Sequence, residues 1–142
     1  MSNDLLKEYA KNNPKRNAVV IGLRDADNNI LLMRTLKLPN WWQPAGGGIE
    51  TSDNSPLAAA IREVEEELGV RLEPGMLLQS MSAPYDFGEG TIYFFESNIN
   101  RELKIEIDIK EVIEYQWFSI EESLKLPVLP AATKFLKLLS QR

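Results

Sequence analysis

Two neighbouring stretches of this sequence decide its fold: Gly46-Gly47-Gly48-Ile49-Glu50 and Arg62-Glu63-Val64-Glu65-Glu66-Glu67-Leu68-Gly69-Val70. The second stretch places four carboxylates on little more than one helical turn, and the first is a glycine-rich loop just before it. Like charges three or four positions apart on a helix cost about 0.2 to 0.5 kcal/mol per pair. Because a simple surface helix rarely accepts that repulsion, the pattern indicates a bound cation.

The residues around the carboxylates predict a helix over residues 56–68. Asn54 or Ser55 can cap its N-terminus, Pro56 suits its first position, and Gly69 stands where a helix ends. Apolar residues recur at spacings of four, three and four and predict the face that packs on a core: Leu57, Ile61, Val64 and Leu68.

Three glutamates then share a second face of the helix, namely Glu63, Glu66 and Glu67. A solvated acidic helix is the alternative interpretation. The spacing of the glutamates, the preceding glycine loop and the caps at both ends together favour a metal site instead.

The residue types favour a hard divalent cation. Mg²⁺ and Mn²⁺ take oxygen ligands and typically bridge carboxylates to substrate phosphates, whereas Zn²⁺ prefers His or Cys. This chain contains no His and no Cys. We therefore predict Mg²⁺ as the cofactor, with Mn²⁺ as a substitute.

Residues 48–70 resemble the signature box of the Nudix (MutT-type) hydrolases, which reads Gly, five residues, Glu, seven residues, Arg-Glu-aliphatic-x-Glu-Glu-x-Gly-aliphatic. The matching residues are Gly48, Arg62, Glu63, Val64, Glu66, Glu67, Gly69 and Val70. One position differs, because Asn54 stands where the family has its first Glu, with Asp53 beside it. That Glu mainly braces the Arg in the family, so we expect Arg62 to pair with Asp53 or with Glu66.

The resemblance implies an α/β fold, the Nudix α/β/α sandwich with a mixed β-sheet. It also implies that Glu63, Glu66 and Glu67 bind metal, joined by a carbonyl near Gly48, and that Arg62 orients the carboxylates. Glu63, Glu66 and Arg62 are thus the catalytic candidates. The general base stays open between Glu63, Glu66 and a carboxylate from a later loop.

Two later carboxylates are candidates for that role. Glu111 precedes Trp117-Phe118 by the spacing at which some MutT-type members carry an extra metal ligand, although a solvated Glu is an equal alternative. Glu89 belongs to a turn-rich loop, residues 85–90, that could cover the site. An exposed hairpin connection is the alternative for this loop.

Aromatic residues near the glycine loop are candidates for binding a flat ring. Trp41 and Trp42 precede it directly, and Tyr85 and Phe87 offer further surfaces. Core packing is the usual role of Trp, but two adjacent Trp on a strand point to opposite faces and cannot enter the same core. Ala132 lies where similar sanitising enzymes carry a purine-reading Asn, and it offers no amide.

Length and charge limit the remaining classes. The chain has 142 residues and 16.1 kDa, which predicts one domain over residues 1–142. A net charge of −5 argues against bulk nucleic acid as a partner, but it allows a small nucleotide whose charge a metal offsets. The apolar runs are too short to span a membrane. The polar first sixteen residues favour a cytoplasmic protein. Monomer and homodimer both stay open.

The other elements are predicted from short apolar runs. Residues 4–11 are expected to form a helix, and residues 18–23 and 30–33 a hairpin around a turn at residues 25–29. Further strands are expected over residues 77–81, 91–96, 103–107 and 114–118, and a closing helix over residues 131–140.

The functional prediction is a Mg²⁺-dependent pyrophosphohydrolase. It would cleave a nucleoside diphosphate linked to another group, or a nucleoside triphosphate, into a nucleoside monophosphate and a phosphorylated product. The alternative is a Nudix-fold nucleotide-binding or regulatory module without catalysis. Glu63, Glu66 and Glu67 disfavour that alternative, whereas the substitution at Asn54 keeps it open.

Overall fold

The chain builds one mixed seven-stranded sheet from two groups of strands that diverge from a hairpin. The computed structural model describes residues 4–141. Its elements are α1 (Asp4–Asn12), β1 (Ala18–Arg24), β2 (Ile30–Thr35), β3 (Trp42–Gln43), β4 (Ala45–Gly48), α2 (Pro56–Leu68), a 3-10 helix (Pro74–Met76), β5 (Leu78–Pro84), β6 (Thr91–Asn98), β7 (Val112–Phe118), α3 (Ile120–Ser123) and α4 (Pro130–Ser140).

The predicted hairpin of β1 and β2 is confirmed at its turn, where Arg24 is opposite Ile30. Away from the turn the two strands take different partners. β1 pairs with β4 and, in parallel, with β6, which in turn pairs with β5. β2 pairs with β3 and β7. We call β1, β4, β5 and β6 the first arm and β2, β3 and β7 the second arm.

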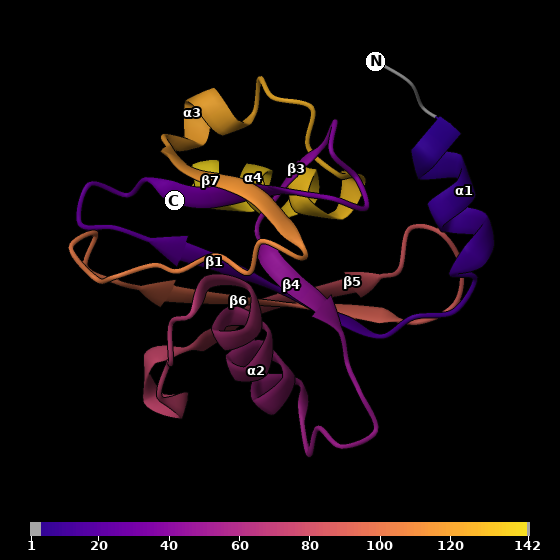
Figure 1. Cartoon of the computed structure of the whole chain (residues 1–142), viewed down its shortest axis with the longest axis horizontal. Coiled ribbons are helices and arrows are strands. Elements are labelled where there is room, and N and C mark those ends of the chain that lie inside the picture. The colour runs from indigo at the N-terminus through magenta and orange to yellow at the C-terminus, as the bar shows by residue number, and fades with distance from the viewer. Residues whose placement is uncertain (1–3, 142) are drawn as a thin grey trace.

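Helices cover both faces of the sheet (Figure 1), and the side chains of β2 alternate between two hydrophobic clusters. Leu31 and Met33 join the cluster that contains Val64 of α2, whereas Ile30 and Leu32 join the cluster built on α4. A strand sends successive side chains to opposite faces, so a buried run such as this needs a helix on each side. The predicted α/β/α sandwich is therefore confirmed.

Helix α2 begins and ends where the sequence predicted. The Ser55 hydroxyl accepts a hydrogen bond from the Ala58 N–H at 3.1 Å, and Pro56 takes the first helical position. Gly69 ends the helix in the left-handed conformation, with φ of 68°. These caps fix the rotation of α2, so its apolar face meets the sheet and its glutamates meet β4.

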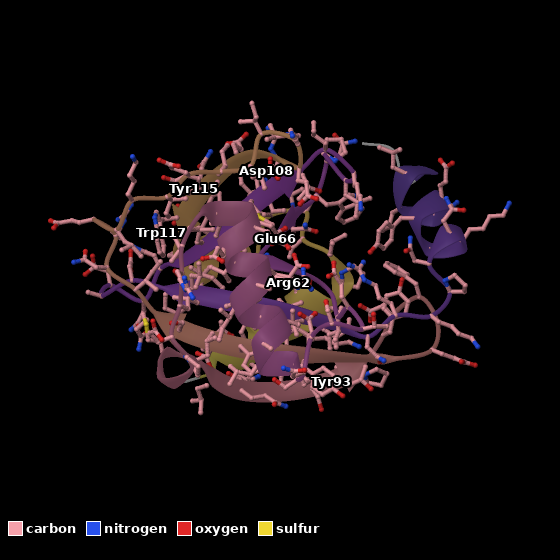
Figure 2. The ribbon with its side chains drawn as sticks, turned by 60° about the horizontal axis from the view of Figure 1, so that its bottom comes forward. Arg62, Glu66, Tyr93, Asp108, Tyr115 and Trp117 are labelled. Atoms are coloured by element: carbon pink, nitrogen blue, oxygen red, sulfur yellow. The ribbon has the colours of Figure 1, made fainter. Side chains whose placement is uncertain are left out.

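The expected strand at residues 103–107 is wrong. This segment is irregular and covers the C-terminal end of α2, where the Glu106 N–H donates to the Leu68 carbonyl at 2.9 Å and the Asp108 N–H to the Glu67 carbonyl at 3.1 Å. Figure 2 shows Asp108 past that end of the helix. Helix carbonyls that lack a partner inside the helix thus take the amides that a strand would have used.

The other expected strands appear as β5, β6 and β7, and the two expected terminal helices appear as α1 and α4. The short strands β3 and β4 were not predicted. None of the helices within residues 4–141 has the length and apolar character needed to cross a membrane.

Candidate active site

A cleft of about 640 Å³ lies between the two arms. Its walls come from β1 and β4 of the first arm, from the segment that follows β2, and from the start of α4. Residues of α1, α2 and the loops before β6 and β7 complete it. The cleft exists because β1 and β2 separate after their shared turn.

Six acidic residues of the described chain line this cleft, and we call four of them the acidic cluster: Glu63, Glu66, Glu67 and Glu111. The first three come from α2, and Glu111 comes from the loop before β7. Glu63 and Glu67 are buried, with 8% and 4% of their surface exposed. The predicted grouping of the α2 glutamates with Glu111 in one cleft is therefore observed.

Burial and mutual repulsion disfavour the charged forms of these groups. Burial raises the pKa of Glu67 well above its usual range, the neighbouring carboxylates raise it further, and a hydrogen bond from the Gly46 N–H at 2.8 Å opposes the rise. Burial also raises the pKa of Glu63, and the Arg62 guanidinium opposes it. The cluster therefore holds more carboxylate than its surroundings neutralise.

The glycines of β4 allow the acidic cluster to approach the sheet. A Cβ atom at Gly47 would lie 2.5 Å from a carboxylate oxygen of Glu63, and one at Gly46 would lie 2.2 Å from the Val19 carbonyl oxygen. Any larger residue at either position would push α2 or β1 away. The glycine run is thus explained by close packing.

Arg62 connects the glycine loop to the acidic cluster. Its guanidinium donates to both carboxylate oxygens of Asp53, at 2.9 and 2.8 Å, and to the Gly48 carbonyl at 3.0 Å. It also donates to Glu63 at 2.9 Å and to Glu66 at 3.1 Å. Figure 2 shows Arg62 and Glu66 along α2. The expected pairing of Arg62 with Asp53 or Glu66 is confirmed, since it pairs with both.

Asp53 is the carboxylate that takes over the bracing of Arg62, while Asn54 is exposed. The hydrogen bond from Arg62 is the main cause that holds the pKa of Asp53 below its usual range. Asp53 in turn is the main cause that raises the pKa of Arg62. The departure from the family pattern is therefore a shift by one position in the loop.

The acidic cluster fits a hard divalent cation by its chemistry. Among residues 4–141 no three acidic side chains are positioned to hold one metal ion together. Arg62 donates hydrogen bonds to Glu63 and Glu66, and the Gly46 amide donates one to Glu67. All the candidate ligand atoms of the cluster are nevertheless carboxylate oxygens. Two of the four residues, Glu63 and Glu67, are buried with a raised pKa, so a nearby positive charge would stabilise their ionised forms. Such a set suits Mg²⁺ or Mn²⁺.

Two predicted binding residues lie elsewhere. The cleft walls that residues 4–141 provide include neither Trp41 nor Trp42. The Trp42 ring packs edge-on against Phe118 at 5.0 Å and receives the Arg34 guanidinium at 5.6 Å. Trp42 thus packs against other residues of the second arm, and substrate binding by Trp41 and Trp42 stays a prediction.

Glu89 is also outside the cleft as residues 4–141 define it. Its side chain is 78% exposed and pairs with Lys15 at 3.5 Å, and its role as the later carboxylate stays a prediction. Tyr85, in contrast, lines the cleft as expected, and its hydroxyl donates to the Asn13 carbonyl at 2.7 Å.

Several cleft residues had no signal in the sequence. They are Tyr9 of α1 and the cations Arg16, Lys37 and Lys110. The three cations are isolated in the sequence, so their spacing indicates no binding site. Tyr9 belongs to α1, which is far from the glycine loop along the chain. The folding of α1 beside the loop that joins β5 to β6 (Figure 1) brings Tyr9 to the cleft, whereas Lys37 follows β2 and Lys110 precedes β7.

Known proteins are similar to this chain in sequence and in fold. The model of the NUDIX domain matches residues 13–139. Diphosphoinositol polyphosphate phosphohydrolase 3-alpha of Mus musculus is 31% identical over 113 residues, which cover 79% of this chain and 68% of that protein. This chain therefore belongs to the Nudix family, and it is a hydrolase that acts on phosphoanhydride bonds.

Solved structures agree on the fold. An Ap4A hydrolase of C. elegans, in a binary complex, superimposes with a TM-score of 0.72 at 17% identity, over 88% of this chain and 96% of that one. The NUDIX domain of Shewanella oneidensis NrtR, complexed with ADP ribose, superimposes with a TM-score of 0.74 at 18% identity, over 100% and 99%. At these identities the likeness concerns the sandwich itself.

Proposed function

We propose that this chain is a Mg²⁺-dependent pyrophosphohydrolase, with Mn²⁺ able to replace Mg²⁺. Its substrate is a nucleoside diphosphate linked to another group, or a nucleoside triphosphate, and the products are a nucleoside monophosphate and a phosphorylated remainder. The observation that carries the proposal is the acidic cluster, two members of which are buried without enough positive charge, in a cleft of about 640 Å³. The relatives named above act on phosphate-rich small molecules by their names.

The residues that would hold the cation are Glu63, Glu66 and Glu67, with Glu111 and the Gly48 carbonyl as further oxygen donors. A divalent cation held there supplies positive charge against the oxygens of the anhydride, whose negative charge otherwise repels an attacking water. Arg62 is a positioning residue, because it holds Glu63, Glu66 and the Gly48 carbonyl in one network.

Hydrolysis needs one proton acceptor. A water oxygen forms a bond to a phosphorus atom of the anhydride, the bond from that phosphorus to the bridging oxygen breaks, and the water proton passes to a carboxylate. Glu63, Glu66 and Glu111 are the candidates for this base, since all three line the cleft. The bridging oxygen leaves on the phosphorylated remainder.

The second candidate function is a nucleotide-binding module without catalysis. Such a module could keep the cleft, but it would gain nothing from four carboxylates that repel both one another and a phosphate. The same grouping is useful to a catalyst that recruits a cation, so the acidic cluster favours hydrolysis.

A substrate panel with Mg²⁺ tests the proposal. It should contain nucleoside triphosphates, nucleoside diphosphate sugars, dinucleoside polyphosphates and diphosphoinositol polyphosphates, with products separated by chromatography. We expect a nucleoside monophosphate from the best substrate. Release of orthophosphate with a nucleoside diphosphate, or no turnover of any nucleotide, would contradict it. The Glu65→Gln variant is a matched control for the cluster, because Glu65 is exposed on the same helix and is not among the cleft residues that the described chain contributes.

A further inference from the structure

Arg16 lies just before β1, and among residues 4–141 it has no carboxylate partner, in contrast to two other arginines. Arg34 pairs with Glu114 and Arg101 with Asp25. Arg16 is half-buried and lines the cleft, and among residues 4–141 no acidic side chain lies within ion-pair distance of it. A partly desolvated guanidinium without an anion is unfavourable, so this position suits an anionic ligand.

The backbone of Arg16 is fixed by the loop that joins β5 to β6. Its N–H donates to the Glu89 carbonyl at 2.8 Å, and the Glu89 N–H donates to the Pro14 carbonyl at 2.9 Å. A Cβ atom at Gly90 would lie 1.8 Å from the Arg16 carbonyl oxygen, so glycine is needed for this approach. The contacts leave Arg16 little backbone freedom.

The side chain of Arg16 is placed as well. Its guanidinium lies 5.6 Å from the centre of the Tyr9 ring, a cation–π contact that draws α1 into the wall of the cleft. Its Nε lies 3.5 Å from where a Cβ atom of Gly48 would be. A planar guanidinium held on an aromatic ring and beside bare backbone is prepared to bind phosphate oxygens in pairs.

Arg16 and the acidic cluster approach β4 from opposite faces. Successive residues of a strand point to opposite faces. The Cβ direction of Gly47 leads to Glu63, and that of Gly48 leads to Arg16. Since both side chains line one cleft, that cleft crosses the edge of β4. A ligand that spans it meets the carboxylates on the α2 face and Arg16 on the other.

Aromatic rings continue the cleft beyond Arg16. Tyr85 and Phe87 are in edge contact at 5.6 Å, and Tyr9 touches Phe87 at 6.1 Å. All three line the cleft. A chain of contacts therefore leads from the acidic cluster across Gly47 and Gly48 to Arg16, and from Arg16 to the three rings. This sequence suits the order anhydride, phosphate and organic ring in a nucleotide, and Asp86 between two of the rings is paired with Lys134.

We propose that Arg16 forms a phosphate subsite for the phosphate that stays on the nucleoside, and that Tyr9 holds Arg16 in place for this role. This inference rests on the proposed function, since it assigns an orientation to the same substrate. The nucleoside lies on the side of Tyr85 and Phe87, and the anhydride lies over the acidic cluster. The N-terminal segment that ends in Arg16 is then part of the substrate site.

Binding of AMP, the proposed product, tests the subsite without turnover. Titration calorimetry with Mg²⁺ compares the wild type with Arg16→Gln, Arg16→Lys and Lys15→Gln, and adenosine serves as the ligand without phosphate. Lys15 is a matched control, because it is adjacent, 76% exposed and paired with Glu89. Thermal melting curves confirm that each variant is folded.

We expect Arg16→Gln to weaken AMP binding at least tenfold and to leave adenosine binding unchanged. Arg16→Lys should recover part of the affinity, and Lys15→Gln should keep all of it. With the best substrate, KM should rise more than kcat falls. Equal AMP affinity in Arg16→Gln, an equal loss for adenosine, or no AMP binding by the wild type would overturn the subsite. If the wild type hydrolyses nothing, the proposed function fails, while AMP binding still decides the subsite.

Discussion

The pairing of Asp53 with Arg62 joins the loop before α2 to the acidic cluster. The two side chains share two hydrogen bonds, and only 6% of the Asp53 side chain is exposed. Removing one partner of a largely buried pair leaves the other charge poorly solvated. We therefore expect Asp53→Asn to lower the free energy of unfolding by about 1 to 3 kcal/mol, measured by urea denaturation of the metal-free protein.

The neighbouring residue provides the control. Asn54 is exposed, so Asn54→Asp should change the free energy of unfolding by less than about 0.5 kcal/mol. Activity should follow the same order, because Arg62 also holds Glu63 and Glu66. If Asn54→Asp costs as much as Asp53→Asn, then the loop is anchored differently from this structure.

Site residues that are grouped by their spacing on one helix could be predicted from the sequence. Site residues that are grouped by tertiary contacts could not. The spacing of Glu63, Glu66 and Glu67 on one helix face was sufficient to group them. Glu111 depended on family spacing. No sequence pattern indicated Arg16, because its proposed role depends on its proximity to Tyr9 and Gly48, which only the tertiary structure creates. Trp42 is the opposite case, since a conspicuous residue near the glycine loop packs against Phe118.

At the scale of elements, the end of α2 depends on Gly69. Its φ of 68° is strained for any residue with a Cβ, and that Cβ would lie 3.0 Å from the Glu106 carbonyl oxygen. We expect Gly69→Ala to lower the free energy of unfolding by about 1 to 3 kcal/mol. Thermal and urea denaturation would measure it.

Gly75 is the matched control for Gly69. A Cβ atom there would have nothing within 4 Å, so Gly75→Ala should change the stability by no more than about 0.5 kcal/mol. Equal effects of the two substitutions would contradict the role of Gly69 as a left-handed cap.

The hairpin of β1 and β2 depends on Asp25 at its turn. Burial would raise the pKa of this carboxyl, but hydrogen bonds from Asn29 and from the Asp27 backbone, with the charge of Arg101, outweigh burial and lower it. A pKa that is lower in the folded protein means stability that is present above the unfolded pKa, about 3.9, and is lost as the pH falls through the folded value.

We expect Asp25→Asn to lower the free energy of unfolding by about 1 to 2 kcal/mol at pH 7. The difference from the wild type should persist down to about pH 5 and shrink below about pH 4. Urea denaturation across this range measures it. A difference that stays constant or grows on acidification would contradict the assigned role of Asp25.

The elements that the sequence missed have physical reasons in common. β4 is nearly all glycine, which has poor strand propensity, and it is a strand only because β1 and Glu63 require a close backbone. Residues 103–107 have a strand-like pattern, but the Glu106 N–H donates to the Leu68 carbonyl, which has no partner inside α2. In both cases the tertiary partner overrides the local preference.

At the scale of the whole molecule, the divergence of the two arms creates the cleft. The short apolar runs of β1 and β2 predicted strands and a hairpin. They did not predict that β1 pairs with β6 in parallel and β2 with β7, because these partners are far away in the sequence. The sequence could therefore locate the candidate site on α2. It could not predict which other segments line the cleft, such as the one that follows β2.

The shape of the cleft bears on base preference. Ala132 in its wall has no side-chain amide that could read a base edge. Under the proposed function, a base would stack on Tyr85 and Phe87 through a face that all bases share. We expect kcat/KM to vary more between phosphate arrangements than between the four common bases. A hundredfold preference for one base, about 2.7 kcal/mol of transition-state stabilisation, would contradict this and indicate a base-reading pocket.

If the acidic cluster recruits a divalent cation for hydrolysis, then the turnover of Glu67→Gln is the most direct measurement of that role. Gln keeps an acceptor for the Gly46 N–H and removes one repelled charge, so the metal-free variant should be no less stable than the wild type. With saturating Mg²⁺ we expect turnover of Glu67→Gln to fall at least a hundredfold, about 2.7 kcal/mol, while Glu65→Gln stays within about twofold. A wild type that keeps full turnover in a chelator, or a Glu67→Gln variant as active as Glu65→Gln, would contradict that role.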